Sequence, residues 1–312
     1  MGRRAKGRAV NGWLVLDKPE GLTSTRAGAQ VRALFGAAKA GHAGTLDPLA
    51  TGLLPIAFGE ATKTMPFALD RTKVYRFTAR WGEARDTDDR DGAVTGTSAA
   101  RPTPDALVAA LPRFVGRIEQ VPPVFSAVKV EGQRAHALAR AGEPPVLKSR
   151  VVDIRRLDLV EAPDPDHALF EMECGSGTYV RALVRDLARA LGTVGHVVAL
   201  RRTALGPFGE KDAISLENLT QLGDSRALDE RLLPVETPLD DIPAVAVTGT
   251  DAARLRRGLP ILLRESFPSD GATVCAMARG RPVALASVAE GLMRPTRVFN
   301  LPFPGAPDVD HA

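Results

Sequence analysis

Residues 40–54, AGHAGTLDPLATGLL, interrupt any regular helix or strand and constrain the fold more than any other stretch. Three glycines allow backbone conformations that other residues avoid, and Pro48 fixes its own φ while favouring an extended Asp47. The apolar run that follows predicts a strand at 53–58. We therefore expect a rigid loop that holds the Asp47 carboxylate beside a core. Because Asp-Pro is a common turn opener, the pair alone favours a plain turn carboxylate.

Hydrophobic periodicity predicts both strands and helices around this loop. Residues 73–81 alternate, so Tyr75 lies on the apolar face and Arg76 on the other face. The pattern alone favours a core tyrosine whose hydroxyl finds a partner. The other expected elements are strands at 13–16, 125–130, 151–160, 168–174 and 200–203, and helices from Thr23 or Ser24 to 35, at 103–114, at 135–141 and at 180–191.

The composition is that of an ordinary globular protein. The chain has 312 residues, of which 44% are hydrophobic and 25% charged, enough for one large domain or two smaller ones. The net charge of +4 permits a nucleic-acid partner without requiring one. The basic start, residues 1–10, is expected to be a disordered tail that adds phosphate contacts if the partner is RNA.

Cysteine usage and hydropathy point to a soluble, cytoplasmic protein. Cys174 and Cys275 lie about a hundred residues apart without CxxC spacing, which argues against a disulfide framework or a zinc site. The N-terminal segment lacks the apolar core of a signal peptide. No apolar run reaches the ~20 residues that a membrane span requires. We expect no membrane association.

The last quarter of the chain predicts a small, mostly β appendage. Pro234, Pro238 and Pro243 punctuate a linker before it. Beyond the linker, the sequence predicts short strands at 245–247, 273–278, 283–288 and 298–301, a helix at 251–257, and frayed residues from Pro302.

The acidic segment 85–92, RDTDDRDG, is similar to a calcium-binding loop but fails its pattern. The loop would need Asp at position 90 and Gly at 91, where this chain has Arg90 and Asp91. Thr97 also stands in place of the closing Glu. We therefore expect a solvated turn between two strands.

A second informative stretch, CGSGTYVRALVRDLA, begins at Cys174. Its apolar residues form a helical stripe, and Arg181, Arg185 and Arg189 share another face at i, i+4 and i+8. Arg185 and Arg189 are expected on a solvated face. Arg181 differs because it lies in the first turn, where the helix dipole disfavours a cation, so we expect an anionic partner.

Familiar catalytic and metal-binding motifs are missing from the sequence. The five histidines are scattered, with no HxxH or HxxxH pair. There is no Walker loop and no GxGxxG, and Ser176 does not lie in a GxSxG elbow. Ordinary hydrolases, kinases and dehydrogenases are thus disfavoured. A loop aspartate, a tyrosine at a strand end and an arginine at a helix start remain.

Six segments occur in the order seen in one enzyme family: GHAGTLDPLATGLLP, KVYRF, DTDDRDG, FSAVKVEGQRAHALARAG, CGSGTYVRALVRDLA and LRRTALGPF. Over residues 11 to about 220 the chain closely resembles bacterial tRNA pseudouridine synthases of the TruB type. The resemblance implies an α+β fold with a mixed, mainly antiparallel sheet and flanking helices. It implies a catalytic domain at 11–235 with an insert at 93–148, and, more weakly, a PUA-like RNA-binding domain at 244–302.

The resemblance also implies roles for eight residues. Asp47 matches the catalytic aspartate, Tyr75 the tyrosine that stacks on the target uracil and is proposed to assist proton removal, and Arg181 the arginine that pairs with the catalytic carboxylate. The implied substrate-binding residues are His42, which enters the space left by the extruded nucleotide, Tyr179 and Leu200 in the pocket, Lys18 beside it, and Asp89 near the RNA. The family converts uridine 55 of the tRNA T-arm to pseudouridine without a cofactor or metal.

The chemistry is consistent with this resemblance. Pseudouridine formation breaks a glycosidic bond and makes a C–C bond, so it consumes no electrons or water. A carboxylate such as Asp47 can form a covalent intermediate, with ribose or with base, and Tyr75 is a candidate base. His136 and Arg85 depart from the family pattern. The alternatives are a non-catalytic tRNA-binding or RNA-folding protein, and a synthase for another RNA or one that uses a guide RNA. We expect a monomer.

Overall fold

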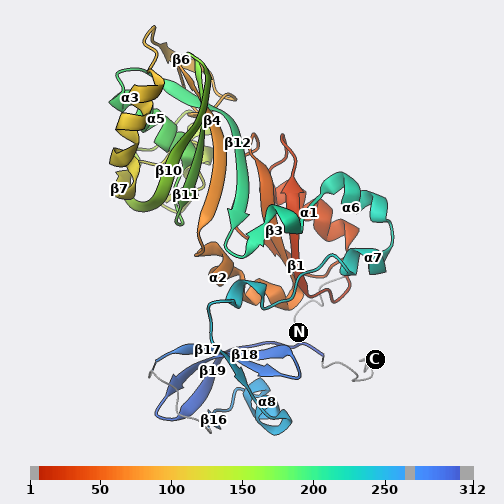
Figure 1. Cartoon of the computed structure of the whole chain (residues 1–312). Coiled ribbons are helices and arrows are strands. Elements are labelled where there is room, and N and C mark those ends of the chain that lie inside the picture. Colours follow the sequence, from red (N-terminus) through yellow and green to blue (C-terminus); the bar gives the residue numbers. More distant parts are fainter. Residues whose placement is uncertain (1–6, 264–270, 303–312) are drawn as a thin grey trace.

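The computed structural model describes residues 7–263 and 271–302. It contains a large α+β unit and a small, mostly β unit that follows it in the chain (Figure 1). This arrangement confirms the α+β fold class with a C-terminal β appendage. In the part of the chain that the structure describes, no helix is long and apolar enough to cross a membrane.

A mixed, mainly antiparallel sheet forms the large unit, as expected. Strands β1 and β14, and strands β3 and β12, pair in parallel, while the other neighbours are antiparallel. The strands run in the order β14 (Ala213–Ser215), β1 (Gly12–Lys18), β3 (Thr51–Phe58), β12 (Gly195–Leu205), β4 (Lys73–Trp81), β11 (His167–Cys174), β10 (Arg150–Asp164) and β7 (Gly116–Gln120), with β2 (Ala40–His42) on β3 and β13 (Phe208–Gly209) on β12.

Most helices of the large unit cover one face of this sheet, and one of them lies on the other face. Its α-helices are α1 (Ser24–Leu34), α2 (Met65–Leu69), α3 (Pro104–Ala110), α4 (Ala135–Arg140), α5 (Val180–Ala190), α6 (Leu216–Leu222) and α7 (Ser225–Asp229). The Thr23 hydroxyl accepts a hydrogen bond from Arg26 N at 3.2 Å and caps α1, as predicted. Val31 of α1 and Leu183 of α5 belong to the same buried core.

The alternation of β4 is confirmed. Tyr75, Phe77, Ala79 and Trp81 are all buried, because each lies on the face that the helices cover. The ring of Phe77 stacks on that of Phe170 from the neighbouring strand β11, with centroids 5.4 Å apart. The opposite face, around Trp13, packs against α2 and the small unit.

The predicted strand at 125–130 is wrong except at its end. Only β8 (Lys129–Val130) is extended in a ladder, and it pairs with β9 (Gln133–Arg134) in a separate hairpin. The sheet edge is instead β7, which the sequence analysis missed. Pro122 and Pro123 follow β7, and because proline lacks an N–H donor they end its pairing with β10.

The small unit is a five-stranded sheet with one helix among the described residues, α8 (Gly249–Arg256). The predicted strand at 298–301 is wrong, because the strand ends at Val298. Phe299 N still donates to Val283 O at 2.8 Å, but Asn300 N donates to Glu60 of the large unit. The strand order is β15 (Ala244–Ala246), β17 (Thr273–Ala278), β18 (Arg281–Ala289), β19 (Leu292–Val298) and β16 (Ile261–Leu262).

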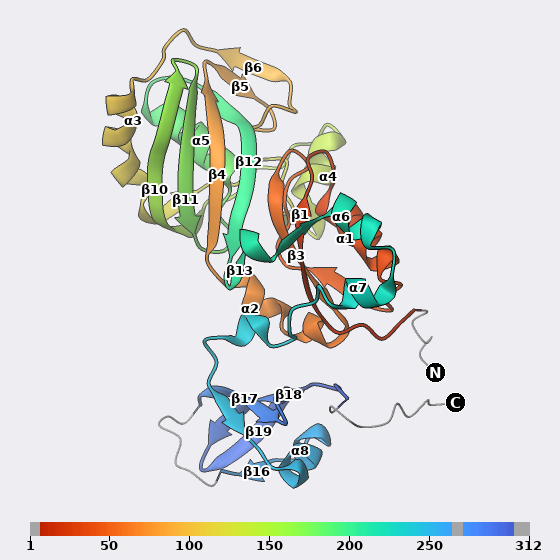
Figure 2. The same cartoon turned by 45° about the vertical axis from the view of Figure 1, so that its right-hand side comes forward.

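The two units are in contact. Glu60 Oε2 of the large unit accepts a hydrogen bond from Asn300 N at 2.7 Å, and Lys63 Nζ donates to Val298 O at 2.8 Å. The connecting segment passes α2 before it enters the small sheet (Figure 2). There the Arg71 guanidinium donates to Pro238 O at 3.2 Å. The proline-rich linker is therefore packed against the large unit.

The expected disordered tail does not extend to residue 10. Residues 1–6 lie outside the described residues, as do those from 303 onward. Arg8, however, forms an ion pair with Asp229 at 2.8 Å and donates to Phe35 O at 3.1 Å. Val10 is buried. Arg8 is thus already engaged by protein groups.

Both cysteines are buried, and this leads to a testable prediction. Burial raises the pKa of the Cys174 and Cys275 thiols to about 11 each. Since the thiolate is the reactive form, we expect the native protein to consume no thiol reagent at about pH 8. After unfolding, both thiols should react. A chromogenic disulfide reagent measures this, and a thiol that reacts rapidly in the native protein would contradict the prediction.

Candidate active site

The predicted loop carries Asp47 to the mouth of the helix-covered face, between β2 and β3. Two glycines of the loop have conformations that other residues rarely adopt: Gly44 has φ +74° and Gly52 has φ +94°. A Cβ on Gly44 would lie 3.0 Å from Arg202 Nη1, and one on Gly52 would lie 2.2 Å from Arg202 O. The glycines therefore let the loop pack directly on β12. In this loop the Asp47 side chain is 33% exposed.

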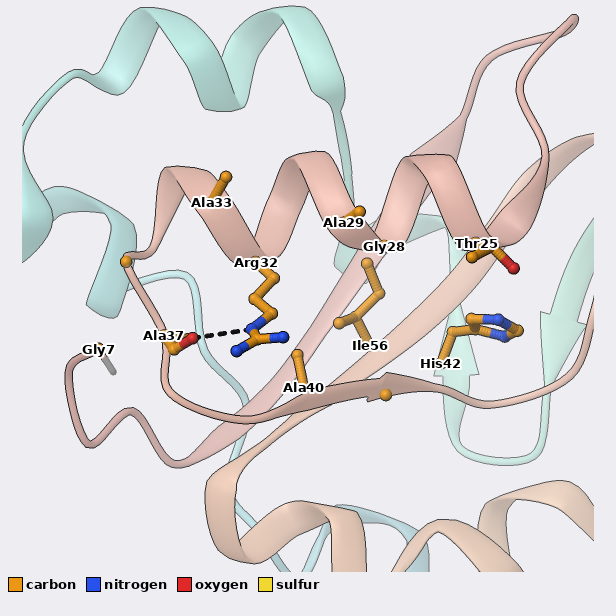
Figure 3. A pocket seen from close by; sticks show the side chains of 12 residues that line it. Gly7, Thr25, Gly28, Ala29, Arg32, Ala33, Ala37, Ala40, His42 and Ile56 are labelled. Carbon is orange, nitrogen blue, oxygen red and sulfur yellow. Dashed lines mark hydrogen bonds between the residues drawn. The ribbon is translucent and has the colours of Figure 1, made fainter. Parts of the chain in front are cut away.

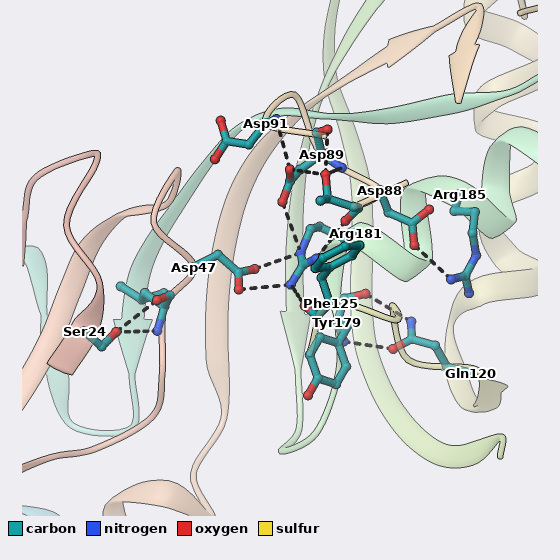
Figure 4. Close-up of polar contacts among 12 residues, drawn as sticks. Ser24, Asp47, Asp88, Asp89, Asp91, Gln120, Phe125, Tyr179, Arg181 and Arg185 are labelled. Carbon is teal, nitrogen blue, oxygen red and sulfur yellow. Dashed lines mark hydrogen bonds and ion pairs between the residues drawn. The ribbon is translucent and has the colours of Figure 1, made fainter. Parts of the chain in front are cut away.

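Arg181 binds Asp47 through both carboxylate oxygens. Its Nε donates to Oδ2 at 2.9 Å and its Nη2 to Oδ1 at 3.0 Å (Figure 4). The guanidinium is almost fully buried, at 3% exposure, and also donates to Thr87 O and Phe125 O. The expected anionic partner of this first-turn arginine is thus confirmed. A planar fork of this kind fixes both the charge and the orientation of the carboxylate.

The expectation of a solvated acidic turn at 85–92 is wrong for Asp88 and Asp89, whereas Asp86, Arg90 and Asp91 are exposed. The turn does join two strands, β5 (Glu83–Arg85) and β6 (Val94–Thr97), but it folds back on α5. Asp89 is buried, with Oδ2 3.6 Å from Arg181 Nε, and burial raises its pKa. The Thr87 hydroxyl donates to Asp89 Oδ1 at 2.6 Å. Asp89 therefore contacts Arg181, the arginine that also binds Asp47.

Arg185 is also not on a solvated face. Its Nη1 pairs with Asp88 Oδ2 at 3.0 Å, and its side chain is 16% exposed. Its Nη2 donates to Val121 O at 2.7 Å. Arg189, by contrast, is 69% exposed, as predicted. Two successive arginines of α5 therefore hold two successive aspartates of the acidic turn.

A buried serine anchors the loop one residue before Asp47. Ser24 Oγ accepts a hydrogen bond from Leu46 N at 2.8 Å and donates to Leu46 O at 3.0 Å. Both groups are buried, so the serine acts as a short strand partner for the loop (Figure 4). Sequence reasoning treated Ser24 only as a possible helix cap and missed this contact.

We expect Ser24→Ala to destabilise the protein by about 1–3 kcal/mol, because it leaves the buried Leu46 N–H without an acceptor. Urea unfolding measures this change. Ser225→Ala is the matched control, since Ser225 is exposed, and it should shift the unfolding free energy by less than about 0.5 kcal/mol. Equal effects of the two substitutions would show that the anchor contributes nothing.

Lys18 ends β1 beneath the same loop. Its ammonium donates to Pro19 O at 2.8 Å, Leu22 O at 2.7 Å and Pro48 O at 3.3 Å. Burial lowers its pKa to about 8, although the charge of Asp47 acts in the opposite direction. Lys18 thus lies within electrostatic reach of Asp47 and holds the carbonyl of the residue that follows it.

Tyr75 and Leu200 line the sheet floor next to the loop. Tyr75 is 9% exposed, and burial raises the pKa of its hydroxyl. Asp47 and Arg202 both lie close enough to act on that pKa, Asp47 by raising it and Arg202 by lowering it. Leu200, 7% exposed, lies opposite Phe77 across the β12–β4 pair.

His42 lies at one end of a groove between α1 and β2 (Figure 3). The groove has a volume of about 600 Å³ and is lined mainly by small residues, with the Arg32 side chain in its middle. His42 Nδ1 lies 3.3 Å from Gly44 O. Burial lowers the pKa of the ring, which favours the neutral imidazole. His42 therefore links the groove to the Asp47 loop.

Tyr179 precedes α5 and is held by a glutamine that sequence reasoning missed. Gln120 Oε1 accepts from Tyr179 N at 2.8 Å, and its Nε2 donates to Tyr179 O at 3.2 Å. The Arg150 guanidinium lies 5.8 Å from the centre of the Tyr179 ring. Gln120 follows no motif, so the sequence contains no signal that would have identified it.

The two departures from the family pattern have structural contacts of their own. Arg85 Nη1 donates to Gly92 O at 2.8 Å and closes the acidic turn. His136 Nδ1 lies 3.0 Å from Ser126 O. Among the described residues, no group of three or more His, Cys, Asp or Glu side chains could hold a metal ion.

The site therefore brings together Asp47, Arg181 and Asp89 by direct contact, with Tyr75 and Lys18 in electrostatic reach. An oriented carboxylate at the mouth of a buried basic and aromatic site can act as a nucleophile or as a base. Arg202 is a further residue that the sequence analysis passed over. Alternation in LRRT places it on the same face as Leu200, a pattern that could have revealed it.

Family models and curated relatives both match this chain along most of its length. A model of the TruB family pseudouridylate synthase N-terminal domain matches residues 32–180, and one of the tRNA pseudouridylate synthase B C-terminal domain matches residues 181–240. A tRNA pseudouridine synthase B of Bradyrhizobium diazoefficiens is 59% identical, covering 94% of this chain and 87% of that protein. One of Caulobacter vibrioides is 56% identical, covering 96% of this chain and 100% of that protein.

Solved structures share the fold. A Cbf5-Nop10-Gar1 complex contains a chain that is 26% identical, with a TM-score of 0.68 over 89% of this chain and 78% of that one. A chain in an H/ACA RNP bound to a substrate RNA matches with a TM-score of 0.72 at 22% identity, over 97% of this chain and 92% of that one. With relatives above 50% identity along nearly its whole length, this chain belongs to the TruB family of pseudouridylate synthases.

Proposed function

We propose that this protein isomerises uridine 55 in the T-arm of tRNA to pseudouridine. The observation that carries the proposal is the two-point hydrogen bonding of Asp47 by a buried Arg181, in a chain of this family. The arginine keeps the carboxylate oriented, while one third of the side chain stays open to a substrate. The close relatives are named tRNA pseudouridine synthase B, which supports tRNA as the RNA partner.

In this proposal the target uridine leaves its stack and enters the space above Asp47. Unstacking a base costs a few kcal/mol, and an aromatic platform such as Tyr75 offsets part of that cost. Leu200 and Tyr179 form the apolar walls of the uracil pocket, and His42 fills the gap that the nucleotide leaves. Asp89 contacts Arg181 from the acidic turn, and Lys18 binds the Pro48 carbonyl of the catalytic loop. In this proposal Asp89 lies near the bound RNA and Lys18 beside the pocket.

The chemistry requires a nucleophile and a proton acceptor. Asp47 attacks the nucleotide, the glycosidic bond breaks, and the freed base turns so that C5 bonds to the ribose. The C5 proton is then removed, and we assign this step to Tyr75. Since the reaction is an isomerisation, it needs no cofactor and no metal in this proposal.

We further propose that residues 11–235 form the catalytic domain and 244–302 a PUA-like domain that binds RNA. In the insert at 93–148, β7 forms the edge of the main sheet and α3 packs on that sheet, whereas β8, β9 and α4 form a separate hairpin and helix. This hairpin and helix are the part that we assign to RNA contacts. We propose a monomer that works in the cytoplasm.

Mapping pseudouridine in a tRNA transcript after incubation with the purified protein tests the proposal. We expect the modification at position 55 and not elsewhere in the transcript. Modification of a different position, or of other RNA only, would support the alternative of a synthase for another RNA. An effect on tRNA folding without any pseudouridine would support the non-catalytic alternative.

A further inference from the structure

Arg202 of β12 is a buried arginine that has no role in the proposed function described above. It is 1% exposed, and its Nε donates to Leu53 O at 2.8 Å. Its Nη2 is buried without a hydrogen-bond partner, and no carboxylate pairs with it among the described residues. A buried charge without a counter-charge costs several kcal/mol. Packing alone therefore does not account for an arginine at this position.

The sheet register places Arg202 beside Tyr75. The two residues are direct partners across the β12–β4 pair, so their side chains leave the same face of the sheet. The charge of the guanidinium lowers the pKa of the Tyr75 hydroxyl, against the effect of burial. Its other side lies under Gly44, where a Cβ would approach Nη1 to 3.0 Å. Arg202 thus sits between the tyrosine and the catalytic loop.

We propose that Arg202 is a positioning residue that directs the Tyr75 hydroxyl at the extruded uracil and stabilises its phenolate form as the acceptor of the C5 proton. This inference rests on the proposed function. In the step, the C5–H bond breaks and its electron pair restores the C5=C6 double bond. The electron pair of the C6=N1 double bond moves to N1, which gains a proton from water, and the C5 proton forms an O–H bond on the Tyr75 phenolate. The hydroxide left by the water then takes this proton from Tyr75, which restores the phenolate.

The surroundings of Tyr75 explain why a cation is needed there. Burial raises the pKa of the phenol, and the charge of Asp47 raises it further. Among the groups that lower the pKa of Tyr75, Arg202 has the largest effect. Lys18 and Lys73, the nearby ammonium groups, are bound to other atoms: Lys18 to three carbonyls, and Lys73 to Leu69 O, Arg71 O and Ser176 Oγ. The guanidinium is thus the cation suited to stabilise a phenolate at this position.

The test compares rates of single-turnover conversion of tRNA that carries hydrogen or deuterium at C5 of the target uridine. We expect Arg202→Met to slow conversion about 10²-fold and to increase the isotope effect, because removal of the C5 proton becomes limiting. Affinity for tRNA should stay within about twofold. In a Tyr75→Phe background the same substitution should slow conversion less than about threefold, because its partner is already absent.

Arg201→Met is the matched control. Arg201 is the preceding residue, points to the other face, and pairs with Asp17 and Glu210 at the surface. It should change neither the rate nor the isotope effect by more than about twofold. If Arg202→Met does not fold, Arg202→Lys keeps the charge without the planar fork and should show a smaller loss with an increased isotope effect.

The outcomes separate this inference from the function on which it rests. No pseudouridine from the wild-type protein would overturn the proposed function and the inference together. An active wild type, with an Arg202→Met loss that is unchanged in the Tyr75→Phe background and leaves the isotope effect unaltered, would overturn the inference alone. Arg202 would then support the loop without acting on the proton acceptor.

Discussion

Asp47→Asn is expected to reduce pseudouridine formation at least about 10⁴-fold while leaving tRNA binding within about threefold of wild type. An amide is a far weaker nucleophile than a carboxylate, so the covalent step is lost. The fold should persist, because the amide oxygen can still accept one of the two hydrogen bonds from Arg181. We expect a loss of unfolding free energy of about 1–3 kcal/mol.

Three measurements check this result on the same protein preparation. Pseudouridine mapping gives the turnover, filter binding at one fixed salt concentration gives the tRNA affinity, and urea unfolding gives the stability. Asp105→Asn is the matched control, since Asp105 is exposed in the first turn of α3 and belongs to none of the site's contacts described above. Turnover by Asp47→Asn within about 100-fold of wild type would rule out the nucleophile assignment.

Arg181→Met should have the largest effect on stability, about 3–5 kcal/mol, together with a loss of activity of at least about 10²-fold. The substitution removes the only fork that holds Asp47 among the described contacts, and it leaves the buried Asp89 without its cation. The carbonyls of Thr87 and Phe125 also lose their donors. Removing one partner of a buried pair costs more than the pair itself contributes.

Arg189→Met, on the same helix but 69% exposed, is the control for this substitution. It should change the unfolding free energy by less than about 0.5 kcal/mol and leave activity unchanged. Arg181→Lys should recover part of the stability but little of the activity, because a point charge cannot orient both carboxylate oxygens. If Arg181→Met and Arg189→Met unfold at the same urea concentration, the buried pair does not stabilise the fold.

The acidic turn shows where sequence reasoning failed and why. As a pattern, residues 85–92 are polar and rich in Asp, which is typical of a solvated turn. In the structure, Asp88 and Asp89 are drawn inside by two arginines of α5, about a hundred residues later in the chain. A polar composition favours exposure of a segment to solvent. Whether its carboxylates are buried depends on which cations the fold places opposite them.

Features that depend on local backbone preference and on periodicity are predictable from the amino-acid sequence. The alternation of β4, the Thr23 cap and the loop around Pro48 follow from backbone conformations and side-chain spacing, and each was predicted correctly. The need of Arg181 for an anion also followed from its place in the first turn of a helix. The ordered set of motifs indicated the family, and the comparisons confirm it.

Contacts between residues far apart in the chain follow instead from the way the chain folds. Asp47 and Arg181 are 134 residues apart, Ser24 and Leu46 are 22 apart, and Arg202 faces Leu53 across 149 residues. No local pattern encodes such contacts, because they depend on the order of strands in the sheet and on how loops pack upon it. For the same reason the position of Arg202 beneath Gly44 and beside Tyr75 became visible only once β12 lay next to β4.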